Sequence, residues 1–246
     1  MQNNTVTQLN LPASKVQTLE PHFGKSNGAS HEADFGQGRL GSELIAISQP
    51  YSSQVEALRV LRGQLVMRWF DDEHRSLAVA SAKAGEGCSY LAANLAVVFA
   101  QLGQRTLLID ANLRDPRQHH IFKLKANIGL SDILAGRADL GSAIQLESVE
   151  NLSILSAGAV TSNPLELLSR ASFKGLMKQA VVQYDVVLVD TTPVTMTADA
   201  QATVAQCGSA LLVSRLNHTK FSDLIEMRDQ IAITGAQIVG SVINDF

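Results

Sequence analysis

Apolar residues are gathered in six short runs of Val, Ile, Leu and Ala, without the strict alternation of a half-exposed strand. Such runs are typical of parallel strands that are buried on both faces of a sheet. The predicted strands are Leu77–Ser81, Arg105–Asp110, Asn151–Leu155, Asp185–Asp190, Ser209–Ser214 and Gln237–Ile243.

The segments between these runs have the spacing of helices. They are Ser89–Leu102, Ser131–Ala135, Pro164–Ser169, Phe173–Val182, Ala198–Ala205 and Ser222–Ile233. Alternation of strand and helix predicts right-handed crossovers and an α/β fold with a doubly wound, mainly parallel sheet flanked by helices.

A further helix precedes the first strand. Ser53 and Glu56 form a capping-box pattern, and the helix is predicted to run to about Trp69. Its predicted buried side consists of Val55, Leu58, Leu65 and Trp69. Glu56, Arg59 and Arg62 recur every three residues. They form either a solvated face with one Glu56–Arg59 pair or a stripe that pairs with a neighbouring subunit, and the spacing alone favours the solvated face.

Composition narrows the class of protein. The chain has 246 residues, 46% of them hydrophobic, which suits one domain with a sizeable core. We expect that domain over residues 42–246 and a disordered arm over residues 1–41, which is polar and serves either as a solvated tail or as a docking segment. The net charge of −3 gives no reason to expect nucleic acid as a partner.

The cysteines and the apolar runs indicate in which cellular compartment the protein is expected. Cys88 and Cys207 are too few for a disulfide framework, so a reducing cytoplasm is expected. No run reaches the roughly 18 apolar residues of a membrane span, and the N-terminal residues lack the pattern of a signal peptide.

Ligands of such sheets bind at the carboxyl ends of strands. After the first predicted strand comes AKAGEGCSY, a glycine-rich turn that opens a helix and can cradle a phosphate with backbone N–H groups. The predicted phosphate-binding residues are Ala84, Gly85, Glu86, Gly87, Cys88, Ser89 and Tyr90. Ser89 falls at the hydroxyl position that ligates Mg²⁺ in P-loops, whereas the lysine of the pattern GxxxxGK[ST] is replaced by Cys88.

Two residues of this turn, Glu86 and Lys83, carry a charge. Glu86 is expected to point to solvent, because a carboxylate repels phosphate. Lys83 either places its ammonium near the phosphates or is a solvated loop lysine.

Two further strands end in carboxylates. Asp110 is either a Mg²⁺ ligand or the cap of a turn, and its position opposite a phosphate loop favours the ligand. Asn112 and Arg114 follow it, and Arg114 either neutralises a transferred phosphate or pairs with a carboxylate. Asp190 ends the fourth predicted strand and is the third predicted metal ligand beside Ser89 and Asp110.

Together these motifs resemble the bacterial tyrosine kinases of capsule and exopolysaccharide assembly. The kinases belong to a class of P-loop NTPases that includes the division-site and chromosome-partition ATPases. The resemblance is carried by SAKAGEGCSYLAANLA, LLIDANLRDP, VVLVDTTPV, SNPLELLSR at Ser162–Arg170, Asp199–Ala200 and EALRVLR at Glu56–Arg62.

The resemblance implies several properties of this chain. It implies ATP or ADP with Mg²⁺ as cofactors, protein tyrosine as the phosphate acceptor, and a homo-oligomer assembled through Glu56, Arg59 and Arg62. It also implies a cytoplasmic protein held at the inner membrane by a membrane-embedded polysaccharide chain-length regulator.

Three departures from the family pattern point to impaired phosphate transfer. Cys88 replaces the lysine, and Asn112 replaces a second aspartate. The tyrosine cluster that usually ends the family's kinases is absent, since the only tyrosines are Tyr51, Tyr90 and Tyr184.

Three functions therefore stay open. The leading hypothesis is a degenerate kinase with a regulatory or structural role; the others are an active kinase, in which Lys83 or Arg114 supplies the charge, and a partition-type ATPase switch. Lys83 favours the switch, because partition ATPases keep a lysine there that reaches a partner's nucleotide. For Cys88, an inert side chain is favoured over a reactive thiolate at a helix N-terminus.

Overall fold

The computed structural model describes residues 41–125 and 128–245, so the predicted arm lies outside the described residues except for Gly41. Within these ranges the chain forms a sheet in the order β3-β4-β2-β5-β1-β6-β7. The strands are β1 (Ser76–Ser81), β2 (Thr106–Asp110), β3 (Ile144–Gln145), β4 (Leu152–Leu155), β5 (Val186–Asp190), β6 (Ser209–Arg215) and β7 (Gln237–Asn244). All pairings are parallel except that of β3 with β4, which confirms the doubly wound, mainly parallel sheet.

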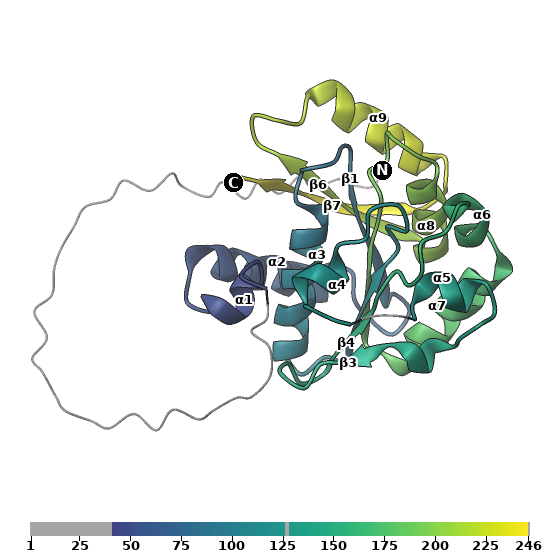
Figure 1. The fold of residues 1–246 in the computed structure, drawn as a ribbon. Coiled ribbons are helices and arrows are strands. Elements are labelled where there is room, and N and C mark those ends of the chain that lie inside the picture. Colours follow the sequence, from purple (N-terminus) through teal and green to yellow (C-terminus); the bar gives the residue numbers. More distant parts are fainter. Residues whose placement is uncertain (1–40, 126–127, 246) are drawn as a thin grey trace, which may run out of the picture.

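Helices cover both faces of this sheet (Figure 1). They are α1 (Ile45–Ser48), α2 (Ser53–Arg68), α3 (Cys88–Gln101), α4 (Gln118–Ile121), α5 (Leu130–Leu134), α6 (Pro164–Leu168), α7 (Ala171–Gln183), α8 (Asp199–Cys207) and α9 (Phe221–Ala232), with a 3₁₀ turn η1 (Leu140–Ser142). The six strands and seven helices expected from the sequence are all present; α1, α4, β3 and η1 are additional.

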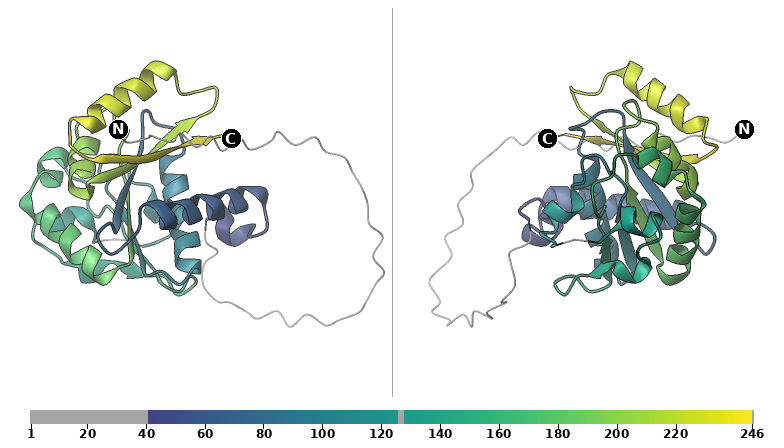
Figure 2. Two further views of the ribbon diagram at one scale, coloured as in Figure 1. Left: turned by 180° about the vertical axis from the view of Figure 1, so that it is seen from behind. Right: turned by 45° about the vertical axis from the view of Figure 1, so that its right-hand side comes forward.

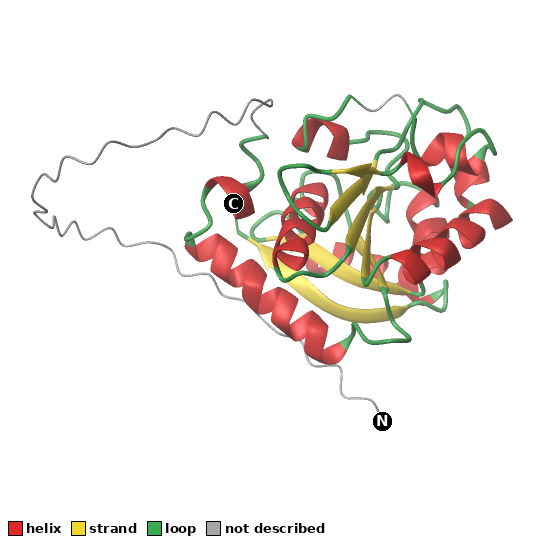
Figure 3. Cartoon of the chain, turned by 90° about the horizontal axis from the view of Figure 1, so that it is seen from below, coloured by secondary structure: helices red, strands yellow, loops and turns green. Residues whose placement is uncertain are grey.

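Each strand faces two hydrophobic cores, which explains the uninterrupted apolar runs. Leu77 and Val79 of β1 point into the core shared with α1, α2 and α3. Ala78 and Ala80 point into the opposite core, which is closed by α5 to α9. Figure 2 shows these two groups of helices on either side of the sheet, and Figure 3 shows the strands between them from below.

Helix α2 packs as its pattern predicts, but its cap is one residue earlier. The predicted buried side chains Val55, Leu58, Leu65 and Trp69 are all buried, and Leu61 joins them. The N-cap is Ser52, whose hydroxyl accepts a hydrogen bond from the Val55 amide at 3.4 Å. The capping box expected at Ser53 is therefore wrong, because Ser53 is already the first helical residue and its hydroxyl donates to Gln54 instead.

The strand order brings the three sequence motifs together. β5 lies between β1 and β2, so the carboxyl ends of these three strands are neighbours. Asp190 of β5 is in register with Asp110 of β2 and with Val79 of β1. In the part of the chain that the structure describes, the helices are all too short or too polar to cross a bilayer.

Candidate nucleotide site

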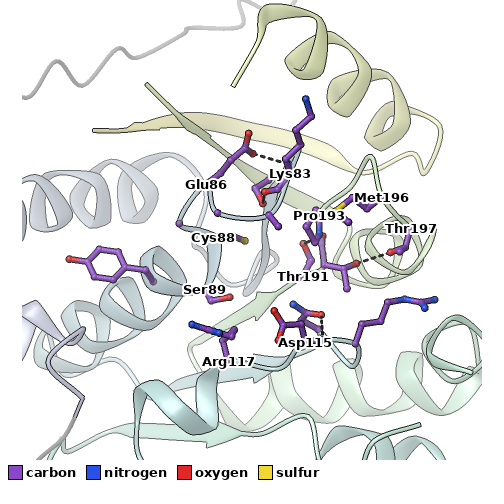
Figure 4. A pocket seen from close by; sticks show the side chains of 18 of the residues that line it. Lys83, Glu86, Cys88, Ser89, Asp115, Arg117, Thr191, Pro193, Met196 and Thr197 are labelled. Carbon is purple, nitrogen blue, oxygen red and sulfur yellow. Dashed lines mark hydrogen bonds between the residues drawn. The ribbon is translucent and has the colours of Figure 1, made fainter. Parts of the chain in front are cut away.

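The loop between β1 and α3 borders a cavity of about 490 Å³ (Figure 4). All seven predicted phosphate-binding residues, from Ala84 to Tyr90, line it. The opposite walls come from the segments that follow β2 and β5, among them Asn112, Arg114, Arg117, Thr191 and Thr192. The cavity thus lies at the carboxyl end of the sheet, where ligands of such folds bind.

The backbone of the loop has the conformation that an anion cradle requires. Gly85 and Gly87 have φ angles of 82° and 88°, a left-handed region that glycine enters without steric cost. Gly87 is also the N-cap of α3, so the free N–H groups of the first helical turn face the cavity mouth. A phosphate fits this arrangement, since helix N-termini attract anions.

Cys88 brings no charge to this cradle. Its thiol is buried and donates a hydrogen bond to the Val79 carbonyl oxygen at 3.0 Å. Burial, reinforced by the carboxylate of Asp190, raises the pKa of the thiol well above its ordinary value. The side chain is therefore a neutral thiol at pH 7, which supports the inert interpretation and removes the basis for a reactive thiolate.

Glu86 is buried rather than solvated, so the expectation for this residue is wrong. Its carboxylate accepts hydrogen bonds from the Lys83 amide at 3.0 Å and from the Thr219 hydroxyl at 2.5 Å. Asn244 of β7 donates to the Glu86 carbonyl oxygen at 3.2 Å, and Arg215 donates to that of Gly85 at 3.2 Å. Glu86 thus connects the loop to the turn after β6 and to β7, and the sequence does not indicate this role because its partners are distant in the chain.

Lys83 is partly exposed and is also ion-paired. Its Nζ pairs with Asp223 Oδ2 at 2.6 Å, in the first turn of α9. Figure 4 shows the side chain rising from the loop toward α9, away from Ser89. In this arrangement its ammonium is paired with Asp223, although Lys83 is among the residues that line the cavity.

Arg114 is held by a carboxylate as well. It donates to both oxygens of Asp199, at 2.5 and 3.2 Å, and Asp199 is almost completely buried. A bidentate pair of this kind is strong and directional. Asn112 is buried at the cavity wall, where its side-chain oxygen accepts the Asp115 amide at 3.0 Å.

Asp110 and Asp190 lie buried beneath the cavity rather than on its wall. Asp110 caps the segment after β2: its oxygens accept the amides of Asn112 at 3.2 Å, Arg117 at 3.0 Å and Gln118 at 2.9 Å. The contacts of Asp110 therefore agree with the alternative in which it caps a turn. Burial, with the charge of Asp190 as the second cause, raises the pKa of Asp110 to about 8.

The two carboxylate oxygens of Asp190 differ in their contacts. Its Oδ2 accepts from Gln118 Nε2 at 2.8 Å, whereas its buried Oδ1 has no hydrogen-bond partner among the described residues. Burial also raises the pKa of Asp190, and the polar side chains of Ser89 and Gln118 oppose that rise. An orphaned carboxylate oxygen beside a serine hydroxyl suits a hard divalent cation such as Mg²⁺.

Arg117 and Gln118 were not singled out from the sequence. Gln118 joins two motifs, because its amide group donates both to Asp190 and to the Ser89 carbonyl oxygen, the latter at 3.1 Å. Arg117 lines the cavity next to Ser89 in Figure 4. The only signal in the sequence was the position of both residues shortly after Asp110, in a segment without apolar periodicity.

The charged stripe of α2 makes contacts within the chain. Arg59 forms an exposed ion pair with Glu56, as the solvated-face alternative expects. Arg62 is half-buried and donates to the Val98 carbonyl oxygen of α3 at 2.7 Å. Burial lowers the pKa of Arg62, and the guanidinium remains charged at neutral pH.

Comparison with known proteins places this chain in a family. Residues 74–227 match the family described as AAA domain. The chain is 34% identical to the tyrosine-protein kinase YwqD of Bacillus subtilis over 84% of this chain and 87% of that protein.

Solved structures agree with this assignment. The kinase domain of the Escherichia coli tyrosine kinase ETK has a TM-score of 0.80 and 31% identity over 87% of this chain and 84% of that one. The Pyrococcus horikoshii septum site-determining protein MinD, complexed with Mg-ADP, has a TM-score of 0.61 and 27% identity over 70% of each chain. The chain therefore belongs to the bacterial tyrosine-protein kinase family, within the MinD-like class of P-loop NTPases.

Proposed function

We propose that this protein binds ATP or ADP with Mg²⁺ in the cavity beside the β1–α3 loop, and that its transfer of phosphate to tyrosine is impaired. The observation that carries the proposal is the neutral, inward-turned thiol of Cys88 at the position of the P-loop lysine. Lys83 and Arg114, the two other predicted sources of charge, are held by Asp223 and Asp199. Transfer develops negative charge on the phosphate oxygens, and a fixed cation normally neutralises it.

The residues that would hold the cofactor differ in their role. Backbone N–H groups from Ala84 to Ser89 would surround the phosphates. The Ser89 hydroxyl and the unpaired Oδ1 of Asp190 would hold Mg²⁺, directly or through water. Asp110 would act from the second layer, because its oxygens already accept backbone amides. Bound Mg²⁺ would supply neutralisation of the phosphate charge.

The cellular role follows from family membership. We infer that the protein regulates polymerisation and export of a capsular or extracellular polysaccharide, as a cytoplasmic partner of a membrane-embedded chain-length regulator. Homo-oligomers would form through the α2 face that carries Glu56, Arg59 and Arg62. Glu56 is exposed and Arg59 is partly exposed, so their mutual ion pair can be exchanged for one with a neighbouring subunit.

An active tyrosine kinase is the second candidate. It is favoured by the survival of Ser89 and of the free Asp190 oxygen at the metal position. A partition-type switch has less support, because it would need Lys83 to leave Asp223 and to reach across a dimer.

Calorimetric titration of ADP, with and without Mg²⁺, tests nucleotide binding in the unmodified protein and in Cys88→Lys. Gln179→Lys adds the same charge on the exposed surface of α7 and is the matched control. We expect measurable Mg²⁺-dependent binding in the unmodified protein and tighter binding in Cys88→Lys alone. Absence of binding in both proteins would refute the proposed cofactor.

Labelled ATP and a tyrosine substrate then test transfer. A lost transition-state donor typically costs about 10²-fold or more in rate, so Cys88→Lys is expected to raise the rate by about that factor. Equal and rapid transfer by the unmodified protein would support the active kinase instead.

A further inference from the structure

We propose that Arg117 supplies the positive charge for nucleotide phosphates in this cavity, in place of the lysine that Cys88 replaces. This inference rests on the proposed nucleotide binding and names the side chain that makes it possible. Arg117 lines the cavity together with the phosphate loop.

The other cations of the cavity are already engaged. Of the three basic residues that line it, Lys83 pairs with Asp223 at 2.6 Å and Arg114 binds both oxygens of Asp199. Within residues 41–125 and 128–245, the guanidinium of Arg117 makes no hydrogen bond or ion pair, and its side chain is exposed to the cavity. It is therefore the cation that can meet an incoming anion without first losing a partner.

The backbone of Arg117 is fixed relative to the phosphate loop. Its amide donates to Asp110 Oδ2 at 3.0 Å, at the end of β2. The next residue, Gln118, is completely buried and donates to the carbonyl oxygen of Ser89, which directly follows Cys88 in α3. Figure 4 shows the Arg117 side chain at the start of α3 beside Ser89. The stem of the side chain thus starts from a rigid point next to the position where the lysine would stand.

Arg117 can supply the positive charge that the Cys88 side chain lacks. The Cys88 thiol donates to the Val79 carbonyl oxygen and offers neither charge nor a hydrogen-bond donor to the cavity. A guanidinium stays charged at all physiological pH values and can give two parallel hydrogen bonds to a phosphate. An arginine at this place would support binding of the ground-state phosphates of ATP or ADP. Its approach from the β2 side differs from that of a lysine within the loop, so efficient transfer does not follow from it.

Testing Arg117→Ala with and without Cys88→Lys distinguishes two possibilities. Either Arg117 replaces the charge of the missing lysine, or it makes a phosphate contact that is independent of that charge. We expect Arg117→Ala to weaken MgADP binding by tenfold or more when Cys88 is present. In the Cys88→Lys background, the same change is expected to weaken binding by less than threefold, because the lysine then supplies the charge. Arg117→Lys is expected to retain most of the affinity. Lys174→Ala, which removes an exposed positive charge on α7, is the matched control and is expected to leave the affinity unchanged.

The measurement is calorimetry with ADP and Mg²⁺, with circular dichroism to confirm that each variant is folded. Unchanged affinity in Arg117→Ala would overturn the inference, and so would an equal loss in both backgrounds. Binding by Cys88→Lys but not by the unmodified protein would also overturn it while leaving nucleotide binding by the fold intact. Failure of both proteins to bind would instead remove the proposed function on which the inference rests.

Discussion

Asp110 and Asp190 stand opposite each other in register at the ends of two adjacent parallel strands, and both are buried. Ionising both of these carboxyl groups has a high free-energy cost, because burial and mutual repulsion each oppose the negative charge. Both residues lie at the carboxyl ends of their strands, beneath the cavity.

The first prediction concerns pH. The pKa of Asp110 is about 8 in the folded protein, above the ordinary 3.8. Between these two values the Asp110 carboxyl group binds more protons in the folded state than in the unfolded chain, so its contribution to the free energy of unfolding falls as pH rises from about 4 to about 8 and then levels off. Asp190→Asn removes the repulsion, so we expect a lower pKa at Asp110 and a smaller fall in stability. Burial keeps that pKa above 3.8 even in the variant.

Carbon-13 NMR of the Asp110 carboxyl group in Mg²⁺-free protein measures its pKa, and urea unfolding at a series of pH values measures the stability. The exposed Asp72→Asn is the control. An unchanged Asp110 titration in Asp190→Asn would show that the two carboxyl groups do not interact.

The second prediction concerns the thiols. Burial raises the pKa of Cys88, and it raises that of Cys207 to about 12. Both are therefore protonated and shielded at pH 7.5, and we expect neither to react with Ellman's reagent over minutes in the folded protein, whereas both react in guanidinium. Cys88→Ala identifies which thiol is responsible if one reacts. A fast phase in the folded protein that disappears in Cys88→Ala would restore the redox interpretation.

The third prediction concerns the anchor of the phosphate loop. Thr219→Val leaves the buried Glu86 carboxylate without one of its donors, which typically costs about 1–3 kcal/mol. We expect faster amide hydrogen exchange across residues 83–88 and weaker ADP binding, although Thr219 does not line the cavity. Thr234→Val, in the turn after α9, is the matched control. Unaltered exchange in the loop would mean that the other contacts of Glu86 suffice.

The fourth prediction separates stability from assembly on α2. Arg62→Ala removes the donor to the Val98 carbonyl oxygen, so we expect a loss of about 1–3 kcal/mol in the free energy of unfolding. Arg59→Ala removes only an exposed ion pair, worth at most about 1 kcal/mol. If the stripe mediates assembly, Arg59→Ala nonetheless lowers the oligomer mass in light scattering. An unchanged mass for that variant would restrict the stripe to contacts within the chain.

The elements were predictable where the chain repeats a simple pattern. Buried parallel strands give uninterrupted apolar runs, and each predicted strand agrees with the structure to within one residue at either end. β3 was missed because two residues cannot show a pattern, and α4, with the sequence QHHI, has no apolar periodicity. Local propensity decides neither element, since tertiary contacts hold both.

The sequence predicted where the cavity lies, but not which partners its charged residues have. Strand ends and glycines located the loop, and all seven loop residues line the cavity. The partners of Glu86 and Lys83 are Thr219 and Asp223, more than 130 residues away, so sequence spacing carries no information about them. Arg117 was missed because its place beside Ser89 depends on the hydrogen bonds of Asp110 and Gln118.

The contact of β7 with the loop has a consequence for the order of events during synthesis. β7 is an edge strand of the sheet, follows every other described element in the chain, and carries Asn244, which donates to the Glu86 carbonyl oxygen. During synthesis this anchor therefore emerges after the other described elements of the sheet. The rest of the sheet can form beforehand, but the loop between β1 and α3 gains its hydrogen bond from Asn244 only after β7 has emerged and paired with β6.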